Sequence, residues 1–476
     1  MRFNIDQQHF IDSIIQFVKT NQSGLVLLNA PAGTGKTTCI YRLYDMLSEL
    51  EKTVTVMAPT HKATTLFHYP IKAKTIHSYF AQRPDYTQSG DMRFFHTREC
   101  LSCYHSFKDE TDKHTHLIAC KPVSITPKSI LFVDEASMID IEMINYFLRC
   151  ARSNLVIFCC DHFQIPPINY PVSPIFQLTQ YLDTFTFTEQ MRAKTDGVRL
   201  YCDKFRESIT LKRHVPTDKV DLGFIVDAFE QKKDAVVISW TNSAKDTLND
   251  AIRERLFARP GTILKDYYVD EQLVFSGFKD CRFEYTLYDH IINDCSLELG
   301  MFKLEPYVST ILTDLFKLVR LYVDCDASYY SSSIVVIQDL SEIELSIPMC
   351  SGRKKSERIR FHCIRDENKA VFLKPIKEHT KVLEKIFKSY KQLILAQVNS
   401  RCKEERNALW RNYYIVTNLL NSQLDYSYSI TCHKAQGSQW HTVIANTTNL
   451  RRAPNGLGDK LCYTAVSRAT TDIYFI

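Results

Sequence analysis

The chain has 476 residues, of which 45% are hydrophobic and 24% charged, and its formal net charge is +5. This length predicts two to four domains, and the composition predicts a packed, soluble protein. This small positive charge is compatible with a nucleic-acid-binding groove but is not evidence for one by itself. No apolar run is long enough to cross a bilayer and Met1–Asp6 is unlike a signal peptide, so we expect no membrane partner.

The 16 cysteines are scattered, and several, such as Cys159, Cys160 and Cys363, lie in apolar stretches. Such residues are typically buried free thiols. The sequence therefore predicts a reducing, intracellular compartment, either nucleus or cytoplasm, and a viral source is also compatible with it.

The first predicted element is a helix that runs to Val18, with Asp6 as its expected N-cap. Gln7 lies at its start. A glutamine amide presents a donor and an acceptor together, which suits the edge of adenine. The alternative is an ordinary surface glutamine.

A phosphate-binding loop is predicted at Ala30–Thr38, between an apolar strand at 25–28 and an amphipathic helix at 39–50. Backbone N–H groups at the start of such a helix surround an anion. We expect Lys36 to reach the β- and γ-phosphates and the Thr37 hydroxyl to hold Mg²⁺. The usual pattern opens with glycine, where this chain has Ala30.

Polar residues follow the predicted strand at 53–58. Because the carboxyl ends of strands in an α/β sheet face the ligand crevice, Thr60, His61 and Lys62 are candidates for contact with a phosphodiester backbone. A solvated loop is the alternative. The segment that carries His77 has the same two interpretations.

Two carboxylates end the apolar strand at 130–135. In a nucleotide enzyme Asp134 would hold Mg²⁺ through water, and Glu135 would polarise the attacking water. The alternative is an acid-rich helix N-terminus. The next strand, at 155–160, leads to Gln164, where a side chain can sense the γ-phosphate.

The second half of the chain opens with a strand at 235–242 and a helix at 244–256. From 265 to 375 the pattern alternates between short strands and one apolar helix near 306–323, without motifs. Residues 377–420 are predicted to form long, charged amphipathic helices.

A candidate zinc site lies between the predicted elements of the first half. Its residues follow a Cys-x₂-Cys-x₁₂-His-x₃-Cys spacing, and a tetrahedral ion would order this polar stretch. Coincidence in a cysteine-rich chain is the alternative, and His105 and His114 are alternative ligands. The candidate ligands are Cys100, Cys103, His116 and Cys120.

Taken as an ordered set, these segments resemble the motifs of superfamily 1 helicases, most of all the 5′→3′ branch that holds the RecD, TraI and phage Dda helicases. The resemblance covers residues 1–80, 128–250 and 403–476, and it departs from the family pattern at Ala30, Cys160 and Ser429. The matching segments are Phe3–Phe10, Ala30–Thr38, Ala58–Ala63, Thr75–Ser78, Asp134–Ser137, Asp161–Pro167, Thr188–Arg192, Thr431–Ser438 and Val466–Ala469.

The resemblance implies an α/β fold of two RecA-like parallel-sheet domains with inserted smaller subdomains. It implies ATP and Mg²⁺ between the domains and single-stranded DNA across them. The expected domains are 1–185, with an insertion at about 80–127; 186–264 and 403–476, which form the second RecA-like domain; and 265–402, an accessory insertion.

Site residues follow from the same resemblance. The expected catalytic residues are Lys36, Asp134, Glu135, Gln164, Arg192 and Arg468, the two arginines acting as arginine fingers. The expected nucleotide-binding residues are Gln7, Ala32, Gly33, Thr34, Gly35, Lys36, Thr37, Thr38 and Gly437. The expected DNA-binding residues are Thr60, His61, Lys62, His77, Asn242, Thr431, His433 and Lys434.

The sequence thus predicts an ATP-dependent DNA helicase that moves 5′→3′, with single-stranded and forked DNA as partners and replication or recombination proteins as candidate partners. Two alternatives stay open. One is a translocase that strips proteins but unwinds poorly, and the other is a nucleotide-switched DNA-binding protein without catalysis. A P-loop kinase is disfavoured by the C-terminal motifs.

Overall fold

The computed structural model divides the chain into two compact units. The first comprises Met1–Arg83, His96–Phe257 and Tyr428–Ile476, and the second comprises Pro84–Phe95 and Ala258–Ser427. The structure describes residues 3–80, 83–90, 92–95, 127–167, 170–191, 195–231, 234–277, 279–281, 327–348, 356–398 and 403–476.

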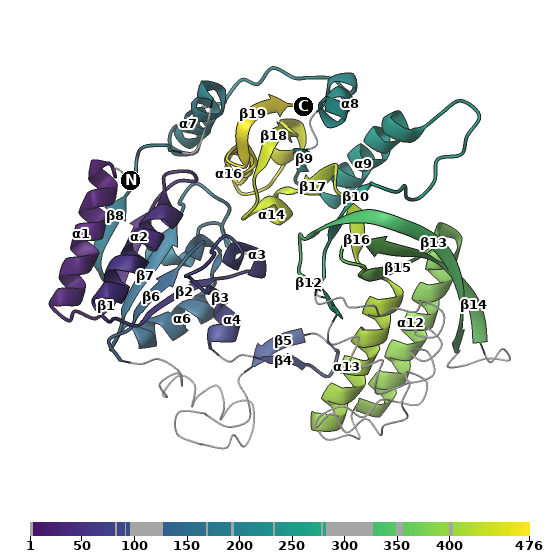
Figure 1. Ribbon diagram of the computed structural model, residues 1–476, viewed down its shortest axis with the longest axis horizontal. Helices are drawn as coiled ribbons and strands as arrows, with labels where there is room; N and C mark the ends of the chain where they lie inside the picture. The colour runs from purple at the N-terminus through teal and green to yellow at the C-terminus, as the bar shows by residue number, and fades with distance from the viewer. Residues whose placement is uncertain are drawn as a thin grey trace. The chain divides into compact units, whose positions relative to one another are not determined.

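The first unit holds a six-stranded sheet in which all neighbouring strands are parallel (Figure 1). Its order places sequence-distant strands side by side, as in a doubly wound α/β fold. In spatial order the strands are β3 (Lys74–Thr75), β2 (Val54–Ala58), β6 (Ile130–Val133), β7 (Leu155–Cys160), β1 (Gly24–Asn29) and β8 (Tyr181–Thr186).

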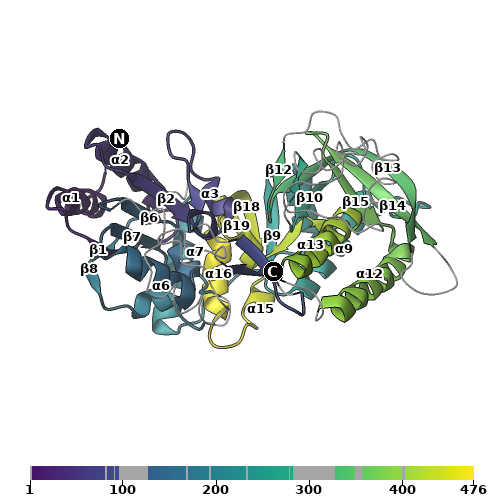
Figure 2. The same cartoon turned by 90° about the horizontal axis from the view of Figure 1, so that it is seen from below.

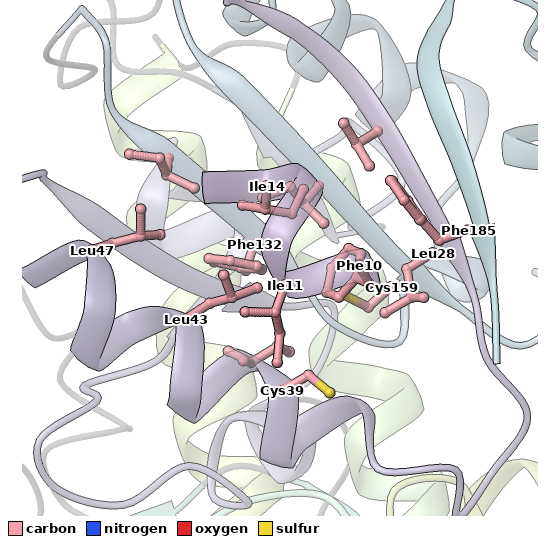
Figure 3. Close-up of a cluster of buried hydrophobic side chains, with 14 of the residues drawn as sticks. Phe10, Ile11, Ile14, Leu28, Cys39, Leu43, Leu47, Phe132, Cys159 and Phe185 are labelled. Atoms are coloured by element: carbon pink, nitrogen blue, oxygen red, sulfur yellow. The ribbon is translucent and has the colours of Figure 1, made fainter. Parts of the chain in front are cut away.

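Successive side chains along each strand point to opposite faces of this sheet, so a hydrophobic core forms on each face. Val26 and Leu28 of β1 belong to the core that contains Phe10 (Figure 3), whereas Leu25 and Leu27 belong to the opposite core. Because successive side chains point to opposite faces, a strand buried on both sides reads as one apolar run. This explains why the predicted strands contain few polar residues.

Helices cover both faces. Helix α1 (Ile5–Lys19) and α2 (Lys36–Glu49) pack on one face, and α6 (Ile141–Cys150) packs on the other. The short elements of this sheet follow strand ends: α3 (His61–Thr64), α4 (Ile76–Tyr79), η1 (Ala136–Met138) and η2 (Pro174–Gln177).

The first unit also holds a second parallel sheet. Its strands, in spatial order, are β17 (Ser429–Thr431), β9 (Ala235–Ser239), β18 (Trp440–Ala445) and β19 (Ala469–Phe475). Its helices are α7 (Asp196–Leu211), α8 (Leu222–Gln231), α9 (Asn242–Phe257), α14 (Cys432–Ala435), α15 (Thr447–Leu450) and α16 (Gly458–Val466).

The second unit is built on an antiparallel sheet, against which two long helices pack side by side (Figure 2). Its strands, in spatial order, are β15 (Val371–Pro375), β14 (Ser356–Asp366), β13 (Ile334–Pro348), β10 (Gln272–Phe275) and β16 (Leu424–Tyr426). The helices are α12 (Lys377–Val398) and α13 (Lys403–Leu420), and two small sheets pair β4 (Arg83–Tyr86) with β5 (Met92–Phe95) and β11 (Lys279–Asp280) with β12 (Ser328–Tyr329).

The fold class is α/β with two parallel sheets, as expected from the sequence. The boundaries of the units differ from the expected ones, because residues 403–427, including α13, belong to the second unit. The apolar helix expected near 306–323 lies outside the described residues. Across the part of the chain that the structure describes, helices are too short or too polar to cross a membrane.

Candidate nucleotide and DNA site

The phosphate-binding loop has the geometry that its sequence predicts. It joins β1 to α2, and the backbone is left-handed at Gly33 (φ 82°) and at Gly35 (φ 87°), the N-cap of α2. A side chain is strained in this conformation, so glycine suits both positions. Lys36 Nζ donates to the carbonyl of Ala30 at 2.5 Å, which holds the ammonium group over the loop.

Gln7 is turned toward this loop and is only 3% exposed. Its Nε2 donates to the carbonyl of Thr34 at 3.0 Å, and its Oε1 accepts from the backbone N–H of Asn4 at 3.1 Å. The Asn4 side chain accepts in turn from the Gln7 N–H, which completes a capping box on α1. In this arrangement Gln7 braces the loop and the helix, in addition to any contact with adenine.

The paired carboxylates stand where β6 ends. Asp134 is 3% exposed, and Glu135 adopts a left-handed backbone (φ 48°, ψ 35°). A non-glycine residue in this conformation is strained, and such strain is often found at functional sites. Glu135 Oε2 is buried without a hydrogen-bond partner. With the Thr37 hydroxyl, these carboxylates form a set of hard oxygen donors that fits Mg²⁺ and its water ligands.

The loop after β7 places Gln164 beside the same carboxylates. Its Nε2 donates to Asp161 Oδ2 at 3.1 Å, and its Oε1 is buried without a hydrogen-bond partner. The residue before Asp161 is Cys160, where glycine is usual. Burial raises the pKa of the Cys160 thiol well above its ordinary value, so this departure adds a neutral side chain to the hydrophobic core beside Asp161.

A cavity of about 190 Å³ joins these groups to residues of the second sheet. Arg468, which is 3% exposed, reaches it just after α16. Its guanidinium is oriented by Nε–H donation to Thr464 O at 3.2 Å and by Nη2–H donation to Ser467 Oγ at 3.1 Å. The lining residues are Ala32, Gly33, Gly35, Lys36, Thr37, Thr38, Leu66, Asp134, Glu135, Gln164, Met191, Gly437, Gln439 and Arg468.

The predicted DNA-binding residues of the first sheet follow the ends of the adjacent strands β2 and β3. Thr60 caps α3, which holds His61 and Lys62, and His77 lies in α4. Burial lowers the pKa of both histidines, and the Asp140 carboxylate opposes this effect at His77. Burial also lowers the pKa of Lys62 to about 8, and its Nζ lies 5.9 Å from the centre of the Trp440 ring.

The second sheet repeats this placement. Asn242 begins α9 after β9, and Thr431 ends the neighbouring parallel strand β17. His433 and Lys434 follow in α14, and burial lowers the pKa of His433. Both sheets thus bring their candidate DNA contacts to the carboxyl ends of adjacent strands.

Other predicted site residues are not described. Arg192 and the candidate zinc ligands Cys100, Cys103, His116 and Cys120 lie outside the described residues. Among the residues that are described, no group of three or more His, Cys, Asp or Glu side chains is arranged to hold a metal ion.

Sequence reasoning missed three polar side chains of this site, in addition to the apolar lining residues Leu66 and Met191. Gln439 lines the cavity, and Asp161 and Tyr463 are hydrogen-bonded beside it. Asp161 lies inside a recognised segment, so its position three residues before Gln164 was an available signal. Tyr463 had none, because its partners are distant in sequence.

Two family models match the chain. An AAA domain model matches residues 3–212, and a UvrD-like helicase C-terminal domain model matches residues 426–476. Together they cover the six-stranded sheet, every strand of the second sheet except β9, and both sides of the cavity.

Two curated relatives have low identity to the chain. Uncharacterized protein R530 of Acanthamoeba polyphaga mimivirus is 22% identical, and the match covers 100% of this chain and 99% of that protein. Uncharacterized protein MJ1519 of Methanocaldococcus jannaschii is 24% identical, and the match covers 98% of this chain but 37% of that protein.

Similar solved structures are those of Pif1 helicases. The Candida albicans protein is 16% identical with a TM-score of 0.42, covering 100% of this chain and 94% of that one. The Bacteroides protein bound to single-stranded DNA is 14% identical with a TM-score of 0.43, covering 100% of this chain and 92% of that one.

The AAA domain model, the UvrD-like helicase C-terminal domain model, the ordered motifs and the cavity shared by the phosphate-binding loop and Arg468 agree with one another. The chain therefore combines an AAA domain with a UvrD-like helicase C-terminal domain, and it resembles the superfamily 1 helicases.

Proposed function

We propose that this protein is an ATP-dependent DNA helicase that translocates 5′→3′ on single-stranded DNA and unwinds duplex DNA. The observation that carries the proposal is the single cavity that brings Lys36 and Glu135 of the first sheet together with Arg468 of the second. Hydrolysis at a site made by two sheets depends on how closely they approach.

Different residues of the cavity serve different parts of the phosphoryl-transfer reaction. Negative charge develops on the equatorial oxygens of the transferred group, and Lys36 and Arg468 are placed to offset it. Glu135 orients and polarises the attacking water. Mg²⁺, when bound by Thr37 and Asp134, neutralises phosphate charge.

Movement on DNA follows from this dependence on closure. Each parallel sheet carries its own candidate DNA contacts, Thr60–Lys62 with His77 on one and Thr431–Lys434 with Asn242 on the other. If ATP binding closes the cavity and hydrolysis opens it, the distance between the two sets of DNA contacts changes once per cycle. Single-stranded and forked DNA are therefore the proposed partners.

The direction and the unwinding are tested together. Duplexes with a 5′ tail, a 3′ tail or no tail are incubated with the protein, with and without ATP. We expect ATP-dependent unwinding from the 5′ tail. Unwinding from the 3′ tail alone contradicts the proposed direction. ATP hydrolysis with protein displacement but no unwinding supports the translocase instead, and absent multiple-turnover hydrolysis supports a nucleotide-switched DNA-binding protein.

Zinc in the segment around Cys100–Cys120 is a second, finer proposal, and it rests on the spacing of the four candidate ligands. Metal analysis of the purified protein decides it, with Cys100→Ser and Cys120→Ser as variants. One zinc per chain that both variants lose supports the site, and a metal-free, active preparation contradicts it.

The proposed compartment is reducing and intracellular, because cysteines such as Cys159, Cys160 and Cys363 are buried thiols. Replication or recombination proteins are proposed partners in that setting. Affinity capture from cells in the presence of nuclease separates direct protein partners from those that DNA alone connects.

A further inference from the structure

The carboxylate of Asp161 is a buried centre of hydrogen bonds beside the nucleotide cavity. The residue is 1% exposed. Its Oδ2 accepts from the Ala32 N–H at 2.7 Å, from Gln164 Nε2 at 3.1 Å and from the Tyr463 hydroxyl at 3.0 Å. Its Oδ1 accepts from the Phe163 N–H at 3.0 Å. One carboxylate therefore joins the phosphate-binding loop, the candidate γ-phosphate sensor and Tyr463.

Tyr463 is the member of this network that comes from the second sheet. It lies in the middle of α16 and is 1% exposed. Its hydroxyl also accepts from the Ala32 N–H at 3.2 Å. Burial and the neighbouring Asp161 carboxylate raise the pKa of Tyr463 well above its ordinary value, so the hydroxyl keeps its proton and donates to Asp161.

The same helix makes further contacts with the loop after β7. One turn before Tyr463, Lys460 Nζ donates to the carbonyl of His162 at 3.2 Å. The rings of Phe163 and Tyr463 meet edge to face, with centroids 5.8 Å apart. Arg468 follows α16 by two residues. The helix that precedes the proposed arginine finger is thus tied to the loop that holds Gln164.

We propose that Tyr463 is a positioning residue that transmits the approach of the second sheet to the phosphate-binding loop and to Gln164 through Asp161. When α16 is seated, the tyrosine hydroxyl supplies the third donor to Asp161 Oδ2. Asp161 then holds the Gln164 amide and the Ala32 backbone in place. When α16 withdraws, Asp161 loses that donor, and the two groups are held less firmly.

The proposal rests on the proposed ATPase, and Tyr463→Phe tests it because this change removes only the hydroxyl. A lost hydrogen bond to a charged group predicts a DNA-stimulated kcat reduced about 10- to 100-fold. The KM for ATP should change less than about threefold, because Lys36 and the loop backbone still bind the phosphates. A purely structural role would instead lower stability without this separation of kcat from KM.

Tyr181→Phe is the matched control. The Tyr181 hydroxyl donates to the carbonyl of Ile175 at 2.6 Å, away from the cavity lining, so its loss should leave kcat within about twofold of wild type. Melting temperatures of both variants are measured alongside. If Tyr463→Phe melts far below the control, Asp161→Asn, which keeps Tyr463, provides the same kinetic readout.

A double-mutant cycle completes the test. If Tyr463 acts through Asp161, Tyr463→Phe should reduce kcat much less in an Asp161→Asn background than in wild type. Wild-type kcat in Tyr463→Phe, or multiplicative effects of the two changes, overturns this proposal while leaving the proposed function intact. A wild-type protein without DNA-stimulated hydrolysis overturns both.

Discussion

Glu135 combines a strained backbone conformation with a carboxylate that is proposed to act in hydrolysis. Its left-handed conformation places a carboxylate at the cavity, with Oε2 buried and without a hydrogen-bond partner. A buried carboxylate oxygen in this state is costly in the free protein. Mg²⁺-bound water and the attacking water would satisfy it, so the cost is consistent with a site prepared for its ligand.

Replacing Glu135 by glutamine should keep nucleotide binding and stop turnover. The amide has nearly the same shape but is a far weaker base, so we expect kcat to fall by about 10²- to 10⁴-fold. Steady-state hydrolysis and titration with a fluorescent ATP analogue measure the two effects separately. Near-wild-type hydrolysis in this variant would assign the role to another group.

Lys62 predicts a pH dependence of DNA binding. With a pKa of about 8, its ammonium group is charged below pH 8 and loses its proton as the pH rises through that value. Because phosphates bind the charged form, DNA affinity should fall between pH 7 and pH 9. Lys62→Arg should flatten this fall, since a guanidinium stays charged throughout. Fluorescence anisotropy measures both, and equal slopes in the two proteins would remove Lys62 from the DNA contacts.

At the scale of elements, the hairpin of β4 and β5 is held against helix α13 of the second unit. The Tyr414 hydroxyl of α13 donates to the carbonyl of Gly90 at 2.7 Å. Gly90 has φ 87°, and a Cβ there would lie 2.6 Å from two ring carbons of Trp410. The turn therefore needs glycine for its backbone conformation and for its close approach to α13.

Gly90→Ala should destabilise the protein more than Gly261→Ala, which is the matched control. Gly261 also has a left-handed backbone (φ 78°), but no heavy atom lies within 4 Å of the added Cβ. Backbone strain should lower the free energy of unfolding of both variants by about 1 kcal/mol. In Gly90→Ala the clash with Trp410 should lower it by a further amount of about 1–3 kcal/mol. Thermal melting of the full chain compares them, and equal losses would show that Trp410 moves aside freely.

At the scale of the whole molecule, the proposed catalysis depends on Arg468, which the second sheet contributes to the cavity. Arg468→Ala should reduce DNA-stimulated turnover by about 10³-fold or more with a smaller effect on nucleotide affinity. Lysine at this position should not restore turnover, because it lacks the planar fork of donors. Single-turnover hydrolysis beside nucleotide titration measures both, and an active Arg468→Ala protein would contradict the shared cavity.

Much of the fold was predictable because its signals are local. Strands such as Leu155–Cys160 are apolar throughout since both faces of a parallel sheet are covered, and the phosphate-binding loop needs only contiguous residues. The left-handed backbone of Glu135 and the brace that Gln7 forms on Thr34 could not be predicted in this way. Both depend on which chain segments lie opposite, and residue type alone carries no such information.

The sequence by itself determined the buried strands, the order of the motifs and the chemical types of the site residues, because periodicity and motif spacing record local backbone geometry. The arrangement in two parallel sheets was expected from the resemblance that the ordered motifs carry. Only the tertiary structure decided which of these residues meet. Asp161 and Tyr463 are 302 positions apart, and their hydrogen bond exists because α16 is seated on the loop after β7. The enlarged second unit was likewise decided by packing, since α13 contacts β15 and shares a buried core with the antiparallel sheet rather than with a parallel sheet.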